Sequence, residues 1–222
     1  MNNKLRMLFM FSLGLLLCFG LIALNISRYK YITSDSVIIS LIQGLEAPTL
    51  TSVMIFFTEL GSSKIIYLIG AFLLIFLFTV IKKRSQLILI PIVFIGARML
   101  NQILKALFHR ERPDLNRLIE IGGYSFPSGH AMNAMAFYGI VTFVVCRHIS
   151  SRWGRTLTIL IGSLLILMIG ISRVYLGVHY PSDVIAGYFA SGFCLVIVIW
   201  IYYLFKEMRQ SRNREGNEKM LP

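Results

Sequence analysis

The chain has 222 residues, of which 56% are hydrophobic and only 14% are charged, and its mean hydropathy is +0.73. Soluble domains carry about 25% charged residues, so this composition excludes an ordinary soluble protein and places the chain in a lipid bilayer. The net charge of +12 is compatible with a nucleic-acid-binding protein or with a membrane protein that has basic loops, and the distribution of the charges separates the two classes.

Six apolar stretches are long enough to cross the hydrocarbon core as helices, which takes roughly 20 residues each. The predicted spans are about 7–26, 65–81, 87–107, 131–147, 156–172 and 184–205. The first span follows a charged start like that of a secretory signal, but its apolar region exceeds the usual ~7–15 residues, so we expect it to be retained. We therefore predict an all-α fold, a six-transmembrane-helix bundle in which residues 1–222 form a single integral membrane domain.

Two shorter amphipathic segments lie between the first two spans, at 34–46 and 49–60, and Pro48 separates them. Ser34 is a suitable N-cap for the first segment. Because each segment is too short to span the bilayer, we expect a short amphipathic helical hairpin at about 33–62 that lies on the outer surface or dips into it.

More than half of the 22 basic residues fall on one side of the membrane if six spans alternate. They are Lys4, Arg6, the run at 82–84, Arg147, Arg152, Arg155, Lys206, Arg209, Arg212, Arg214 and Lys219. The positive-inside rule then predicts a multi-pass protein of the cell (plasma) membrane with both termini cytoplasmic. This asymmetry accounts for the net charge, so no nucleic-acid partner is expected. The three cysteines lie in or at the ends of spans and are interpreted as free buried thiols, which say nothing about redox compartment.

Alternation of the spans brings six polar residues to the outer, extracytoplasmic face. They are Lys105, Arg112, His130, Arg173, His179 and Asp183. Polar residues near hydrocarbon are costly, so a shared functional pocket is the default hypothesis. Lys105 and Arg112 are seven residues apart and would share a helix face if the third span persisted to Pro113.

The residue types in this pocket indicate phosphate chemistry. Residues 128–130 begin the fourth span, where unpaired backbone N–H groups and the helix dipole attract an anion. Asp183 follows His179 by four residues and is expected to accept a proton from one ring nitrogen, leaving the other nitrogen free to attack phosphorus. His130 would protonate the leaving group and then activate water. A metal site built from the two histidines and Asp183 is less favoured because the cations would repel a divalent ion, so no metal or other cofactor is expected.

Three segments carry a family resemblance: "KALFHRERP" at 105–113, "PSGH" at 127–130 and "SRVYLGVHYPSD" at 172–183. They resemble the KX6RP, PSGH and SRX5HX3D motifs of the type 2 phosphatidic acid phosphatase superfamily, with every motif residue present over the core 105–183. Size and span plan are most similar to bacterial phosphatidylglycerophosphatase B-type membrane lipid phosphatases. The resemblance implies that the catalytic residues are His179, His130 and Asp183. It implies that the phosphate-binding residues are Lys105, Arg112, Ser128, Gly129 and Arg173.

Other polar residues near these motifs have two interpretations. Arg98 is either a buried structural residue, with Glu59 as one candidate partner, or it lines the pocket floor or the substrate path with Asn101 and Gln102. The charged residues that surround the first motif are expected to form a solvated outer loop. They are Arg110, Glu111, Asp114, Arg117 and Glu120.

The sequence therefore predicts an integral membrane lipid phosphatase that acts through a phosphohistidine. Its partners would be the bilayer and a membrane lipid phosphate, with the oligomeric state unassigned. Phosphatidylglycerophosphate ranks first as substrate, undecaprenyl diphosphate second and phosphatidic acid third. Two other classes stay open: a lipid phosphotransferase that passes the phosphoryl group to an alcohol, and a transporter or channel with charges in its spans.

Overall fold

The computed structural model describes residues 3–29, 32–80, 86–114 and 116–218, which are helices and connecting loops without strands. The helices in these ranges are α1 (Asn3–Tyr29), α2 (Thr33–Gln43), α3 (Pro48–Leu60), α4 (Ser63–Val80), α5 (Leu89–Phe108), α6 (Gly129–Cys146), α7 (Arg152–Tyr175) and α8 (Pro181–Glu218). The predicted all-α class is confirmed, and six of these helices are long and apolar enough to cross a membrane: α1 and α4 to α8. The basic run at 82–84 and Lys219 lie outside the described residues.

Helix α6 is at the centre of the bundle. Its sequence is apolar or small on every side, as expected of a helix that is surrounded by others, and it packs against α5, α7, α8 and α4. Outer helices such as α4 expose large apolar side chains, including Phe72 and Leu68, because lipid covers that surface in a membrane. The core therefore forms around α6, and both of the helix's ends are held by neighbours.

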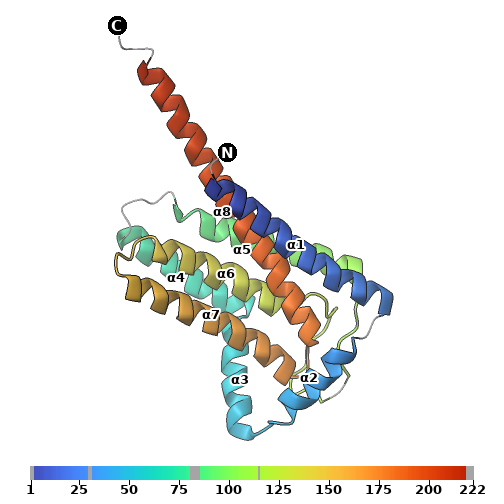
Figure 1. Ribbon diagram of the computed structural model, residues 1–222. Coiled ribbons are helices and arrows are strands. Elements are labelled where there is room, and N and C mark those ends of the chain that lie inside the picture. The colour runs from blue at the N-terminus through green and yellow to red at the C-terminus, as the bar shows by residue number, and fades with distance from the viewer. Residues whose placement is uncertain (1–2, 30–31, 81–85, 115, 219–222) are drawn as a thin grey trace.

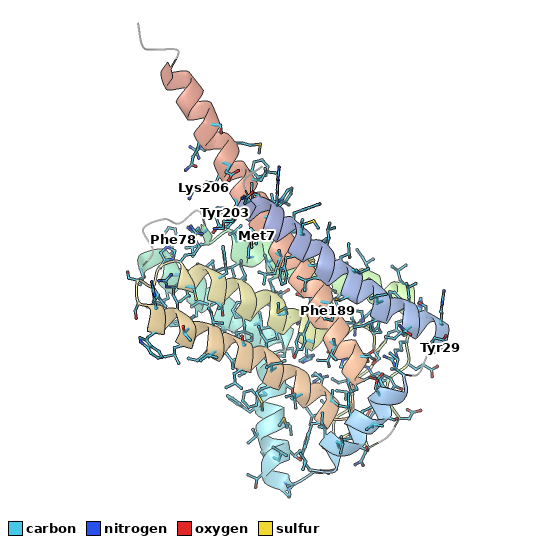
Figure 2. The ribbon with its side chains drawn as sticks, in the orientation of Figure 1. Met7, Tyr29, Phe78, Phe189, Tyr203 and Lys206 are labelled. Atoms are coloured by element: carbon cyan, nitrogen blue, oxygen red, sulfur yellow. The ribbon has the colours of Figure 1, made fainter. Side chains whose placement is uncertain are left out.

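The described ends of the chain lie at one end of the bundle, and the connections that carry the motifs lie at the other. Figure 1 shows the start of α1 beside α8, whose C-terminal part projects beyond the bundle. In Figure 2, Met7, Tyr203 and Lys206 lie together at this end and Tyr29 lies at the other. Contacts agree, since Lys4 Nζ is 4.1 Å from the centre of the Tyr203 ring. We call the opposite end, where α5 and α7 end and α6 and α8 begin, the motif end.

The predicted hairpin is present as α2 and α3 at the motif end (Figure 1). Helix α3 packs on α7, and α2 packs on α7 and α8. The start differs by a residue or two from the expectation, because Ile32 takes the N-cap position of α2 in place of Ser34. On α2, Asp35 and Ile39 face the protein, while Val37 and Leu41 are exposed, as on a helix that lies at a membrane interface.

Candidate active site

Three helix ends build the site. Helix α5 stops at Phe108 because His109 adopts a left-handed conformation with φ of 46°. Helix α6 begins at Gly129, with the Ser128 hydroxyl accepting the Ala131 N–H as an N-cap. Helix α8 begins at Pro181, which suits the first turn of a helix.

The end of α5 at Phe108 corrects one expectation. Arg112 does not continue the face of Lys105 along a helix, because α5 has ended and residues 109–114 form a loop. In this segment Arg110 and Arg112 are buried and Glu111 between them is exposed. Both arginines therefore face the protein. Arg112 still reaches the site, and Arg110 is not part of a solvated loop.

His179 and Asp183 are buried together beneath the motif end, with exposures of 2% and 0%. The His179 Nδ1 atom is 3.5 Å from Asp183 Oδ2 and 3.3 Å from the Ser125 hydroxyl. Ser125 also donates a hydrogen bond to Asp183 Oδ2, and the Tyr180 N–H donates to the same oxygen over 3.0 Å. The structure thus brings the predicted pair together and adds Ser125, which the motifs do not mark.

The other ring nitrogen of His179 faces Arg112. The distance from Arg112 NH1 to His179 Nε2 is 3.1 Å. A guanidinium group can only donate hydrogen bonds, so Nε2 is the acceptor and the ring proton lies on Nδ1. Arg112 also donates to the backbone carbonyls of Val178 and Gly123, over 2.7 Å and 2.9 Å.

The electrostatic setting keeps His179 neutral. Burial lowers the pKa of His179 well below its ordinary value, and the positive charges of Arg173, Arg112 and Lys105 lower it further. Burial also lowers the pKa of Arg112, while the charge of Asp183 opposes that shift. His179 is therefore an unprotonated base surrounded by cations, which is the state a nucleophile needs.

The two remaining predicted phosphate-binding cations lie on α5 and α7. Lys105 Nζ donates to the Tyr124 carbonyl over 2.8 Å. Arg173 is 1% exposed, and its NH1 donates to the Thr58 hydroxyl of α3. Among the described residues, Nε and NH2 of Arg173 have no hydrogen-bond partner although both are buried. Buried donors are normally satisfied, so these two N–H groups are suited to an oxyanion.

The turn at 127–130 presents less backbone than expected. The Ser128 N–H donates to the Asp183 carbonyl over 3.1 Å, so this N–H is already used; within the described residues, the Gly129 and His130 N–H groups and the Ser128 hydroxyl proton are the donors left at this turn. Asn101 lies against Gly129, where a Cβ atom would be 3.1 Å from Asn101 Oδ1. Asn101 Nδ2 also donates to the Pro127 carbonyl, so it supports the turn.

The second predicted histidine, His130, is partly buried in the first turn of α6. Its ring lies next to Gly61, the residue that ends α3, where a Cβ atom would be 3.3 Å from His130 Cδ2. Within the described part of the chain, neither ring nitrogen of His130 has a hydrogen-bond partner. The ring can therefore exchange a proton with a bound group.

The candidate substrate-path residues separate in the structure. Arg98 is half-buried and donates to the Ser63 hydroxyl at the start of α4, with its guanidinium 5.9 Å from the Tyr67 ring centre. No ion pair joins it to Glu59 in the described ranges, where its hydrogen-bond partner is the Ser63 hydroxyl. Gln102 is exposed on α5, whereas Asn101 contacts the turn at 127–130.

The side chains around His179 and Asp183 offer few ligands for a metal ion. Across the described residues, no group of three or more His, Cys, Asp or Glu side chains is arranged to hold one. Asp183 and His179 are the acid and imidazole that meet here, and both are engaged with arginine.

Comparisons with known proteins identify a family and several relatives of this chain. Residues 86–207 match the PAP2 superfamily. Phosphatidylglycerophosphatase B of Bacillus subtilis (strain 168) is 33% identical over 192 residues, which covers 84% of this chain and 91% of that protein. Undecaprenyl-diphosphatase of Sulfolobus acidocaldarius is 29% identical over 208 residues, covering 90% and 85%. The crystal structure of a transmembrane PAP2-type phosphatidylglycerolphosphate phosphatase from Bacillus subtilis superimposes with a TM-score of 0.78 at 30% identity, covering 88% of this chain and 96% of that one.

Proposed function

The chain belongs to the PAP2 superfamily and is a membrane phosphatase, and from this premise we propose that it hydrolyses phosphatidylglycerophosphate to phosphatidylglycerol and phosphate through a phosphohistidine. The observation that carries the chemistry is the geometry at His179, whose Nε2 accepts a hydrogen bond from Arg112. Arg173 adds two buried nitrogens, Nε and NH2, that have no partner among the described residues. The choice of lipid is supported by the Bacillus subtilis phosphatidylglycerophosphatase B at 33% identity.

In the first step, the lone pair of His179 Nε2 attacks phosphorus and an Nε2–P bond forms. The P–O bond to the lipid breaks, and its electron pair stays on the lipid oxygen, which takes a proton from His130. Lys105, Arg112 and Arg173 neutralise the oxygens of the transferring group, which is the main demand of phosphoryl transfer. Asp183 stabilises the positive charge that the His179 ring gains on attack, because its carboxylate lies 3.5 Å from Nδ1.

In the second step, His130 takes a proton from water as the water oxygen attacks phosphorus. The Nε2–P bond breaks, its electron pair returns to His179, and inorganic phosphate leaves. The Ser128 hydroxyl and the Gly129 N–H contribute donors at the start of α6, where the helix dipole favours an anion. No metal takes part in this scheme, since side chains supply the positive charge.

The proposed orientation places the motif end at the extracytoplasmic face of the plasma membrane and both termini in the cytoplasm, with residues 1–222 as one integral membrane domain. Supporting it, the basic residues Lys4 and Lys206 lie at the end of the bundle opposite the motifs, as the positive-inside rule requires of the cytoplasmic side. A lipid would then keep its tails in the bilayer while its phosphate reaches the ends of α5 to α8.

Undecaprenyl diphosphate is the second candidate substrate, because the Sulfolobus acidocaldarius undecaprenyl-diphosphatase aligns over 90% of this chain. The same two steps would cleave a diphosphate, with a lipid monophosphate as leaving group. Phosphatidic acid and transfer to an alcohol acceptor rank lower, since neither has a distinguishing feature in the site.

The test is phosphate release by the purified protein in detergent from phosphatidylglycerophosphate, undecaprenyl diphosphate and phosphatidic acid, without an alcohol acceptor. We expect the highest kcat/KM on phosphatidylglycerophosphate and none with His179→Ala. His148→Ala is the matched control, because this exposed histidine lies just beyond the far end of α6, and its side chain bonds the Val144 carbonyl of that helix and no other described residue. A higher kcat/KM on undecaprenyl diphosphate would reverse the ranking, and dependence on an added alcohol would identify a transferase.

A further inference from the structure

Arg110, which no motif marks, contacts the carboxylate behind the nucleophile. Its NH1 is 2.6 Å from Asp183 Oδ1, and its NH2 is 3.1 Å from Asp35 Oδ2 of α2. The side chains of Arg110, Asp35 and Asp183 are 5%, 5% and 0% exposed. The guanidinium therefore joins the hairpin to the site through two buried, charge-assisted hydrogen bonds, which are the strong kind.

Asp35 also holds the start of α8. Its Oδ1 accepts the Ser182 N–H over 2.9 Å, and its Oδ2 accepts the Ser182 hydroxyl over 2.6 Å. The first N–H groups of a helix have no partner within the helix, and an acid at that end is favoured by the helix dipole. Asp35 thus caps the start of α8 from the neighbouring helix α2, and it does so at Ser182, the residue before Asp183. Figure 1 shows α2 beside this end of α8.

The two oxygens of Asp183 have different partners, and this difference indicates what the arrangement does. Oδ1 is held by Arg110, while Oδ2 faces Ser125, the Tyr180 N–H and His179 Nδ1. The Arg110 hydrogen bond to Oδ1 limits rotation of the carboxylate together with the Ser125 and Tyr180 donors on Oδ2, so Oδ2 stays directed at Nδ1. This contact in turn keeps the ring proton on Nδ1 and leaves Nε2 as the attacking atom.

The charge balance indicates why a second acid is present. Arg110 paired with Asp183 alone would cancel the negative charge that His179 needs as its ring becomes positive. Asp35 pairs with the second nitrogen of the guanidinium, NH2. The three side chains of Arg110, Asp35 and Asp183 therefore carry one net negative charge next to the nucleophile. The Tyr180 ring, 4.0 Å from Arg110 Cζ, covers the guanidinium by a cation–π contact.

We propose that Arg110 and Asp35 are positioning residues that hold the Asp183 carboxylate and the start of α8, so that His179 presents Nε2 to phosphorus and the α2–α3 hairpin is an obligatory part of the active site. This inference rests on the proposed role of His179 as nucleophile. Neither residue touches the phosphate, so both act on the rate of phosphorylation and leave phosphate binding unaltered.

The experiment measures the single-turnover rate constant of enzyme phosphorylation with enzyme in excess, since this constant does not depend on the folded fraction. Loss of one charge-assisted hydrogen bond corresponds to roughly a 10- to 100-fold loss of rate. We expect losses of this size for Arg110→Gln and Asp35→Asn, with Arg110→Lys in between because it keeps the charge but cannot reach both acids. Inhibition by inorganic phosphate should stay within about 2-fold of the wild type, because a change that small is below the energy of one hydrogen bond.

A double variant tests whether Arg110 and Asp35 act through one network or independently of each other. Losses at independent sites multiply, whereas residues in one network are not additive. We expect the Asp35→Asn/Arg110→Gln protein to be close to the slower single variant. The matched controls are Asp114→Asn, at an aspartate that is 95% exposed and pairs with Arg117 in the same loop, and Arg152→Gln at an exposed position on the opposite end.

The rate constants are measured with phosphatidylglycerophosphate and with p-nitrophenyl phosphate, whose cleavage needs no lipid recognition. Wild-type rates for both Arg110→Gln and Asp35→Asn would overturn the positioning role while the proposed function stands. Equal losses in the control variants would overturn it as well. If the wild type cleaves only p-nitrophenyl phosphate, the proposed lipid substrate is refuted, and the rates of the variants on that ester decide the positioning role. If the wild type cleaves neither compound, the proposed function and the positioning role are both overturned.

Discussion

Arg173 is the residue whose replacement should separate activity from stability most clearly. It is 1% exposed, it forms no ion pair within the described residues, and its Nε and NH2 groups have no partner there. A buried donor without a partner costs about 1–3 kcal/mol. Arg173→Met removes two such groups at the expense of one hydrogen bond to Thr58, so we expect the variant to be about 1–3 kcal/mol more stable and to melt a few degrees higher.

The same substitution should nearly abolish phosphate release. If Nε and NH2 each donate to phosphate in the transition state, two charge-assisted bonds of about 1.5–3 kcal/mol are lost. At about 1.4 kcal/mol per factor of ten, kcat/KM falls by roughly 10²- to 10⁴-fold. Melting curves in detergent with and without inorganic phosphate give the stability and the binding together, because a ligand that binds the folded state raises the melting temperature.

We expect phosphate to stabilise the wild type and Arg152→Met, and to leave Arg173→Met unchanged. The reasoning would be refuted by an Arg173→Met protein that retains activity within tenfold of the wild type. It would also be refuted if the variant melted below the wild type, since the unpartnered groups would then not be a cost that binding relieves.

The remaining predictions concern the packing at Gly61, the protonated nitrogen of His179, the Ser125 hydroxyl and the effect of a metal chelator. A Cβ at Gly61 would lie 2.5 Å from Ile169 Cγ2, so Gly61→Ala should lower the unfolding free energy by about 1–3 kcal/mol; thermal melts should show a smaller loss when Gly61→Ala is made in an Ile169→Ala background, and an equal loss there would contradict the packing argument. Because burial and nearby cations lower the pKa of His179, the ring takes a second proton only well below about pH 6.5, and ¹⁵N-histidine NMR at about pH 6 should show the proton on Nδ1 alone; a doubly protonated ring would be the contrary result. Ser125→Ala removes a donor to Asp183 and should slow phosphorylation roughly tenfold in quench-flow, whereas an unchanged rate would make that hydroxyl dispensable. EDTA should leave phosphate release intact, and inhibition that added Mg²⁺ reverses would show that a metal takes part.

Sequence patterns predicted the spans because length and hydropathy decide which helices cross a bilayer, and those features are local. They also predicted that His130, Arg173 and His179 lie at the same end of the bundle, because the alternation of six spans fixes the end at which each residue lies. The hairpin was predicted from amphipathicity, but the patterns did not show that Asp35 faces inward against α8 while the apolar face turns outward.

The errors arose where a helix ends. Lys105 and Arg112 were expected on one helix face, and the αL conformation of His109 ends the helix before that. Past that residue the chain is a loop in which Arg110 and Arg112 are buried and Glu111 between them is exposed; the alternating charge in "HRERP" was the signal for it. Ser125 and Thr58 carry no such signal, because their roles depend on contacts across 58 residues to Asp183 and across 115 residues to Arg173.

The most direct test of the account is to trap the phosphorylated enzyme. Rapid alkaline quench of the protein with phosphatidylglycerophosphate labelled in the terminal phosphate, followed by peptide mapping, should find phosphate on Nε2 of His179, with no labelled protein for His179→Ala. Label on any other residue, or phosphate release by His179→Ala at the wild-type rate, would contradict the account.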